Sequence, residues 1–139
     1  LRPDKTTVAG IHATAIAYAT GAEGSLPLRR MIGWSEGQLR ERALALARAL
    51  GWDAGCVRAS EATVGGGSLP GDVLPSVAIA VPTAEVTRTA RALRRAGVVG
   101  RVHAGELWID LRSVLPEDDT ALVAALRGVA GAGSSPTAD

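Results

Sequence analysis

The chain has 139 residues, of which 47% are hydrophobic and 21% are charged, a balance that suits a globular domain with an apolar core. The formal net charge of +1 excludes a nucleic-acid-binding protein whose affinity comes from a large overall positive charge alone. The single cysteine excludes an internal disulfide, which fits a reducing compartment, and we expect a cytoplasmic protein. No apolar run is long enough to cross a bilayer, so no membrane partner is expected.

The first residues have the pattern of a helix and not of a signal peptide. Asp4 precedes apolar residues at helical spacing, from Val8 to Ala19, and Gly21 follows them. This pattern predicts a first amphipathic helix, followed by a short connector. Position 1 is Leu1 and not an initiator methionine, and we therefore expect the chain to be a piece of a longer protein.

A second helix is specified at both ends. Ser35 and Gln38 have the spacing of a capping box, and Gly51 has the residue type that commonly ends a helix. Between them, apolar residues form one stripe, which consists of Leu39, Ala43, Leu46 and Leu50.

Two strands are predicted after this helix. Residues 55–64 contain valine and threonine and run into a glycine cluster. Residues 74–81 are apolar on both faces and are bounded by prolines, as expected for a strand that helices cover on one side.

Thr83 is the predicted cap of another helix, which Gly97 ends. Its apolar residues Val86, Ala90 and Leu93 point inward. The outer faces carry four arginines, which are Arg88, Arg91, Arg94 and Arg95. Cations at such spacing suit RNA phosphates, but this face lacks stacking aromatic residues, and we expect it to be solvated.

The hairpin and the last helix complete the order of elements. Residues 98–103 and 106–111 flank a tight Ala104-Gly105 turn, with one face of the second strand packed and the other polar. The packed residues are Leu107, Ile109 and Leu111, and the polar face is formed by Trp108, Asp110 and Arg112. Pro116 begins a helix that Gly128 ends, and residues 130–139 are expected to be a disordered tail. The fold class is therefore α+β, with an antiparallel or mixed sheet of about four strands and helices packed on one face.

Few residues have the chemistry of a catalytic centre. His12 and His103 stand apart from any cluster of metal ligands, so no metal site is predicted, and Cys56 fits a small buried hydrophobe. The glycine loop at residues 65–68 could present backbone N–H groups to an anion. A plain connection between two strands explains the loop about as well.

Three stretches resemble bacterial selenocysteine synthases, the L-seryl-tRNA(Sec) selenium transferases. They are LRPDKTT at the start, VGGGSLPG followed by LPSVAIA at residues 64–80, and GRVHAGELWIDLRSVLPEDD at residues 100–119. The stretches agree with that family in order and spacing.

The resemblance implies the C-terminal portion of a fold-type I enzyme that uses pyridoxal 5'-phosphate, bound mainly by a large domain outside the chain. Residues 1–34 would be the linking helix and connector, and residues 35–129 the small C-terminal α+β domain. The lysine that carries the cofactor is expected before Leu1, which leaves no catalytic residue in this chain. Lys5, its only lysine, stands in the first turn of a helix and is a poor candidate for that role.

The resemblance also implies the partners and a binding role. The substrates would be seryl-tRNA(Sec) and selenophosphate, and the enzyme would be a homo-oligomer. Arg2 matches a position where the family binds an anionic substrate, a task that suits a guanidinium group, and Gly66, Gly67 and Ser68 are the further candidate substrate-binding residues. On the residues alone, Arg2 is more simply a solvated terminal arginine.

Two other functions remain open. One is a related pyridoxal-phosphate lyase or transferase that acts on a small amino acid or amino sugar phosphate. The other is a freestanding, non-catalytic α+β module that binds a ligand or a partner protein.

Overall fold

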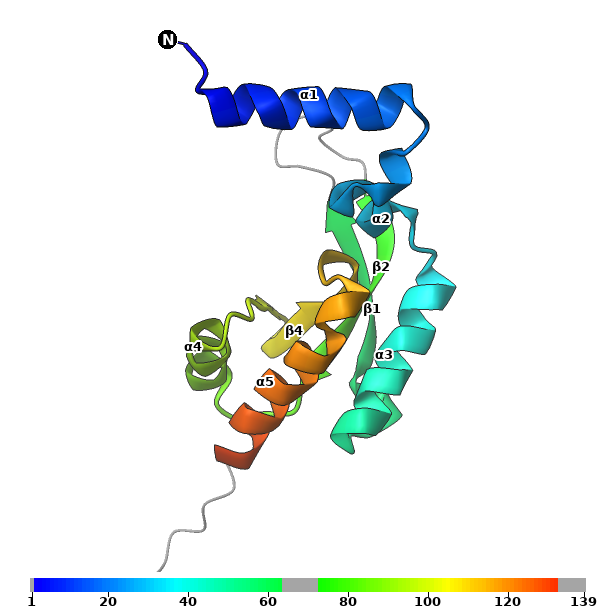
Figure 1. Ribbon diagram of the computed structural model, residues 1–139. Coiled ribbons are helices and arrows are strands. Elements are labelled where there is room, and N and C mark those ends of the chain that lie inside the picture. Colours follow the sequence, from blue (N-terminus) through cyan, green and yellow to red (C-terminus); the bar gives the residue numbers. More distant parts are fainter. Residues whose placement is uncertain (1, 64–72, 133–139) are drawn as a thin grey trace, which may run out of the picture. The chain divides into compact units, whose positions relative to one another are not determined.

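The computed structural model describes residues 2–63 and 73–132 (Figure 1). The chain divides into two compact units, Leu1–Trp34 and Ser35–Asp139. None of the helices in the described ranges is long and apolar enough to cross a membrane.

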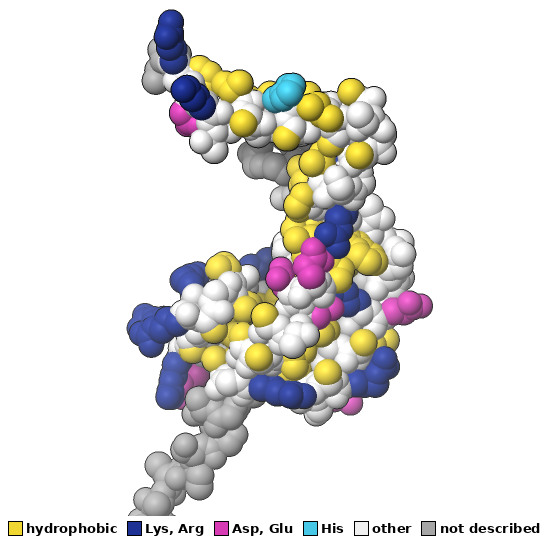
Figure 2. All heavy atoms as spheres, in the orientation of Figure 1, with side chains coloured by type: hydrophobic (Ala, Val, Ile, Leu, Met, Phe, Trp, Pro, Cys, Tyr) yellow, Lys and Arg dark blue, Asp and Glu magenta, His cyan; other side chains and the backbone are white. Residues whose placement is uncertain are grey.

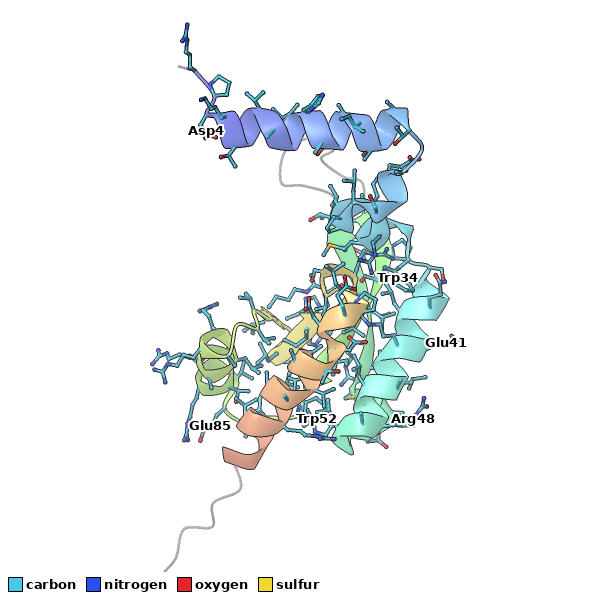
Figure 3. The ribbon with its side chains drawn as sticks, in the orientation of Figure 1. Asp4, Trp34, Glu41, Arg48, Trp52 and Glu85 are labelled. Carbon is cyan, nitrogen blue, oxygen red and sulfur yellow. The ribbon has the colours of Figure 1, made fainter. Side chains whose placement is uncertain are left out.

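The first unit consists mainly of helix α1 (Lys5–Ala19) and the short helix α2 (Pro27–Gly33). Asp4 caps α1, because its carboxylate accepts the Thr7 backbone N–H at 2.8 Å and the Thr7 hydroxyl at 3.1 Å. This confirms the predicted start of the helix, and Asp4 is labelled in Figure 3.

Helix α1 is not amphipathic within its unit, and that part of the sequence prediction was wrong. No residue of α1 is buried, and its large apolar side chains are 48% to 65% exposed. These side chains belong to Val8, Ile11, Ile16 and Tyr18. The opposite side consists of small residues such as Gly10, Ala13 and Ala17, so the helix has no charged face to contrast with the apolar one.

The second unit is an antiparallel sheet covered by helices. Strands β1 (Val57–Thr63), β2 (Val73–Val81), β3 (Arg101–His103) and β4 (Glu106–Asp110) lie in the order β1-β2-β4-β3. Every described pairing is antiparallel, which confirms the α+β class and decides against a mixed sheet. Figure 1 shows α3 (Glu36–Leu50), α4 (Val86–Arg95) and α5 (Asp119–Ala132) on one face, with α5 between the other two.

Helix α3 follows the sequence prediction closely. The Ser35 hydroxyl accepts the Gln38 N–H at 3.2 Å, while the Gln38 side chain accepts the Ser35 N–H at 3.0 Å. Gly51 ends the helix with a φ of +70°, a left-handed conformation that glycine adopts without strain. The buried residues of α3 are Leu39, Ala43, Leu46 and Ala47, whereas Leu50 of the predicted stripe is only partly buried.

The apolar side chains of strand β4 are also part of the core. Leu107 pairs with Val81 and Ile109 with Ile79, and all four side chains are buried. Leu93 of α4 and Leu126 of α5 are fully buried as well. The predicted hairpin turn is confirmed, with φ values of +48° at Ala104 and +81° at Gly105.

Several boundaries differ from the sequence prediction. Helix α4 begins at Val86, because the Thr83 hydroxyl accepts the Glu85 N–H and forms a separate turn before the helix. Strand β3 begins only at Arg101. A 3-10 turn at Pro116–Asp118 precedes α5, and α5 passes Gly128 and ends at Ala132, inside the stretch predicted as tail.

Candidate functional site

The sheet face opposite the helices carries polar side chains that contact one another across strands. Because side chains alternate along a strand, the register that turns Val77, Ile79 and Ile109 toward the helices turns their neighbours to this second face. We call it the open face. Its polar and aromatic residues are Arg58, Ser60, Ser76, Arg101, His103, Glu106, Trp108 and Asp110.

Asp110 is the centre of a hydrogen-bond network on the open face. Its carboxylate accepts the hydroxyls of Ser60 at 2.7 Å and Ser76 at 2.6 Å, and the Arg112 backbone N–H at 3.0 Å. Arg101 in turn donates to the Ser60 hydroxyl at 2.6 Å. The network therefore joins all four strands and fixes the side chains before any ligand arrives.

Glu106 organises the neighbouring part of the open face. Its two carboxylate oxygens accept from the Arg58 guanidinium at 3.1 Å and 2.8 Å, and the Trp108 indole N–H donates to it at 2.8 Å. The hydrogen bond from Arg58 is the main reason why the pKa of Glu106 lies below its ordinary value. Glu106 is therefore held as a carboxylate near neutral pH.

The sequence prediction placed Trp108 and Arg112 on a polar face, and the structure buries both side chains. Trp108 is 8% exposed because its indole lies over the small side chains of Ala78 and Ala80. Arg112 is 6% exposed, and its guanidinium donates to the Pro75 carbonyl.

A shallow pocket of about 350 Å³ lies on the open face. Arg101 stands over the Trp108 ring, with 5.6 Å between its guanidinium carbon and the ring centroid, and the His103 ring lies 4.4 Å from the same ring. The Ser60 hydroxyl donates to Asp110 and accepts from Arg101, so it is held within the hydrogen-bond network. The donors on Arg101 and His103 suit the binding of a polar or anionic group. The pocket is lined by Ala59, Ser60, Glu61, Arg101, His103 and Trp108.

The predicted substrate-binding residues fall in two places. Arg2 is exposed in the first unit and makes no hydrogen bond or ion pair with any residue of the described ranges. The nearby Asp4 accepts the Thr7 N–H, which is the main reason why the pKa of Asp4 is lowered. Gly66, Gly67 and Ser68 lie outside the described residues. The strand pairing on either side of them ends with Thr63 opposite Val73 in the second unit.

The described residues do not fit the site of a covalently held pyridoxal phosphate. Such a site encloses the lysine and offers a carboxylate to the pyridine nitrogen. Lys5 is exposed in the first turn of α1, and α1 contributes no buried residue that could enclose it. The sequence-based view of Lys5 as a poor candidate agrees with this position.

The remaining candidate groups give no catalytic centre. Within residues 2–63 and 73–132, no three His, Cys, Asp or Glu side chains gather as metal ligands. Cys56 is 8% exposed, and burial raises the pKa of its thiol, which keeps it protonated and unreactive. Cys56 therefore packs as a small hydrophobe, as its sequence context predicted.

Comparison with known proteins gives consistent matches. Residues 1–115 match the family model described as L-seryl-tRNA selenium transferase. The L-seryl-tRNA(Sec) selenium transferase of Photorhabdus laumondii subsp. laumondii is 36% identical over 140 residues, which cover 91% of this chain and 30% of that protein. The enzymes of that name from Campylobacter lari and Salmonella paratyphi B are 28% and 34% identical, over 93% and 84% of this chain. The chain spans less than a third of the length of these curated relatives.

Proposed function

Because the chain belongs to the L-seryl-tRNA selenium transferase family, we propose that it is part of an enzyme that converts seryl-tRNA(Sec) to selenocysteinyl-tRNA(Sec). Selenophosphate is the proposed selenium donor. The seryl hydroxyl is replaced by a selenol, and phosphate is released. The observation that carries the proposal is the family match over residues 1–115, together with 36% identity across 91% of the chain.

The proposal puts the cofactor outside this chain. Pyridoxal phosphate, when bound, supplies an electron sink for the negative charge that develops beside the amino group of an amino acid. The exposed position of Lys5 supports a cofactor lysine in polypeptide that precedes Leu1. In this arrangement, the second unit is the small C-terminal domain of a fold-type I enzyme, and α1 is the helix that links it to the large domain.

The role proposed for this chain is to bind and orient anionic groups beside the cofactor. Arg2 binds an oxyanion of the substrate or the donor, because a guanidinium remains charged at every working pH and holds two oxygens at once. Gly66, Gly67 and Ser68 are the further residues that we propose for substrate binding. The homo-oligomer that we propose would cover apolar side chains such as Ile11 and Tyr18, which α1 exposes.

The direct test is an activity assay with the purified full-length protein. With selenophosphate and seryl-tRNA(Sec), we expect selenium to become attached to the tRNA through an amino acid that alkaline hydrolysis releases. Parallel reactions contain free serine or an amino sugar phosphate in place of the charged tRNA. Turnover of a small substrate with no reaction of seryl-tRNA(Sec) would replace this proposal by a related lyase or transferase.

The same assay tests the role of Arg2. In the full-length enzyme, Arg2→Gln should lower kcat/KM by roughly tenfold to a hundredfold, the range for a lost hydrogen bond to a charged group. Arg29→Gln is the matched control, since Arg29 is also exposed in the first unit. Equal effects of the two substitutions would remove Arg2 from the binding site.

A further inference from the structure

Helix α4 concentrates positive charge on the side that faces away from the core. Its ten residues include four arginines and no acidic residue. Leu93 is fully buried and anchors the inner side. At 100° per residue, Arg88, Arg91 and Arg95 fall within a sector on the opposite side, with Arg94 beside them. Figure 2 shows Lys and Arg side chains gathered over this helix, at the left of the second unit.

Most of this charge is not neutralised by the protein. Arg88 forms an ion pair with Glu85 at 3.0 Å, whereas the other three arginines have no hydrogen bond or ion pair with any described residue. Elsewhere in the second unit, Arg40 and Arg42 of α3 are each paired with a carboxylate. Three arginines without a carboxylate partner among the described residues therefore lie together on α4.

The stability of α4 does not explain this arrangement. Cations in the last turn of a helix interact favourably with its dipole, which accounts for Arg94 and Arg95 but not for Arg88 or Arg91. Arg91 also lies three and four residues before Arg94 and Arg95, spacings at which like charges repel. The cluster weakens the free helix, and an external anion would relieve that repulsion.

We propose that the outer face of α4, formed by Arg88, Arg91, Arg94 and Arg95, binds the phosphate backbone of a base-paired arm of the tRNA substrate. This inference rests on the proposed function. Arg88, Arg91 and Arg95 lie on successive turns and span about 10 Å along the helix axis, so they contact more than one phosphate. Backbone contacts of this kind need correctly spaced cations and no base sequence.

The amino-acid composition of the outer face of α4 favours binding to a base-paired arm of the tRNA over binding to unpaired nucleotides. Recognition of splayed-out bases uses aromatic side chains on which the bases stack, and α4 contains none. Double-stranded RNA is instead bound through its phosphates and its shape. The reacting end of the tRNA therefore lies elsewhere, and α4 holds the body of the molecule.

The test compares variants of the full-length protein for binding to a tRNA(Sec) transcript over a range of salt concentrations. The double variant Arg91→Gln/Arg95→Gln should bind on the order of tenfold more weakly at moderate salt. The slope of log affinity against log salt should fall by roughly one for each lost phosphate contact. KM for seryl-tRNA(Sec) should rise while kcat stays unchanged, because α4 does not contact the reacting group.

Two controls make the result specific. Arg48→Gln removes one exposed charge from α3, on the other side of α5, and should leave affinity and slope unchanged (Figure 3). Arg91→Lys/Arg95→Lys keeps the charges and should restore most of the binding. A double glutamine variant with wild-type affinity and slope would overturn the inference while leaving the proposed function intact. A wild-type enzyme that binds no tRNA(Sec) would overturn both.

Discussion

Arg42 joins three segments of the second unit through its guanidinium group. It contacts both carboxylate oxygens of Asp119 at 3.0 Å and 3.1 Å through Nε. It also donates to the carbonyls of Leu111 at 3.1 Å and Val114 at 2.8 Å. The pair lies 77 residues apart in sequence, so helical periodicity alone could not identify it. Once formed, it fixes the start of α5 against α3.

Loss of this arginine should weaken the fold measurably. Arg42→Met keeps most of the apolar stem but leaves Asp119 and two carbonyls without their donor, and we expect a loss of about 2 kcal/mol in the free energy of unfolding. Urea denaturation of the two proteins measures this. Arg40→Met is the matched control, since its pair with Glu36 at 3.7 Å is half-exposed and should contribute within about 0.5 kcal/mol. Equal losses from both variants would contradict this role of Arg42.

Glu106 should make stability depend on pH in a defined direction. Its folded-state pKa lies below the ordinary value of 4.5, mainly because of the hydrogen bond from Arg58. The carboxylate therefore stabilises the fold above its unfolded-state pKa, and that contribution is lost as the pH falls through the folded-state pKa. Relative to wild type, Glu106→Gln should have a lower Tm at neutral pH, and the difference should shrink as the pH falls below the ordinary value of 4.5. A Tm difference that stays constant with pH would show that the negative charge of Glu106 does not contribute to the stability of the fold.

Local sequence signals identified the elements whose determinants lie within one turn or one hairpin. The Ser35 and Gln38 pair predicted the start of α3, and Ala104-Gly105 predicted the turn before β4. The Asp110 network could not be predicted, because Ser60 and Ser76 lie 50 and 34 residues from Asp110 and meet it only through the strand register. The open-face pocket was missed for the same reason.

Two errors had a different origin. The alternation of residue types predicted Trp108 and Arg112 on a polar face. Alternation does not show that the small side chains of Ala78 and Ala80 leave room for the Trp108 indole to pack against them. The apolar spacing in α1 was taken as one face, although small residues continue around the helix. In both cases the pattern was real, and the neighbouring residues determined the burial.

The hairpin turn offers a test at the level of an element. Ala104 has a φ of +48°, a conformation that costs free energy in residues with a Cβ atom and that asparagine tolerates better. Ala104→Asn should therefore raise the free energy of unfolding by about 0.5 to 1 kcal/mol, and thermal or urea denaturation measures the change. Ala104→Val should have the opposite effect, because branching at Cβ makes positive φ less favourable. A destabilised Ala104→Asn variant would show that the turn has another shape in solution.

The distribution of buried residues separates the two units at the scale of the whole molecule. Every described buried hydrophobic side chain lies between Leu39 and Leu126, and the first unit contributes none. We therefore expect residues 35–139 without residues 1–34 to unfold cooperatively in urea. The removed segment should matter only for activity and for self-association, because α1 exposes apolar side chains. Loss of cooperative unfolding in the shortened chain would contradict this division.

The central proposal is that this chain is part of a selenium transferase whose cofactor lysine lies in another part of the polypeptide. Borohydride reduction of the full-length protein loaded with pyridoxal phosphate fixes the cofactor to its lysine, and mass spectrometry of the peptides then locates the modified residue. We predict a single modified lysine in a peptide that precedes Leu1, with Lys5 unmodified. Modification of Lys5, or of no lysine at all, would contradict the proposal.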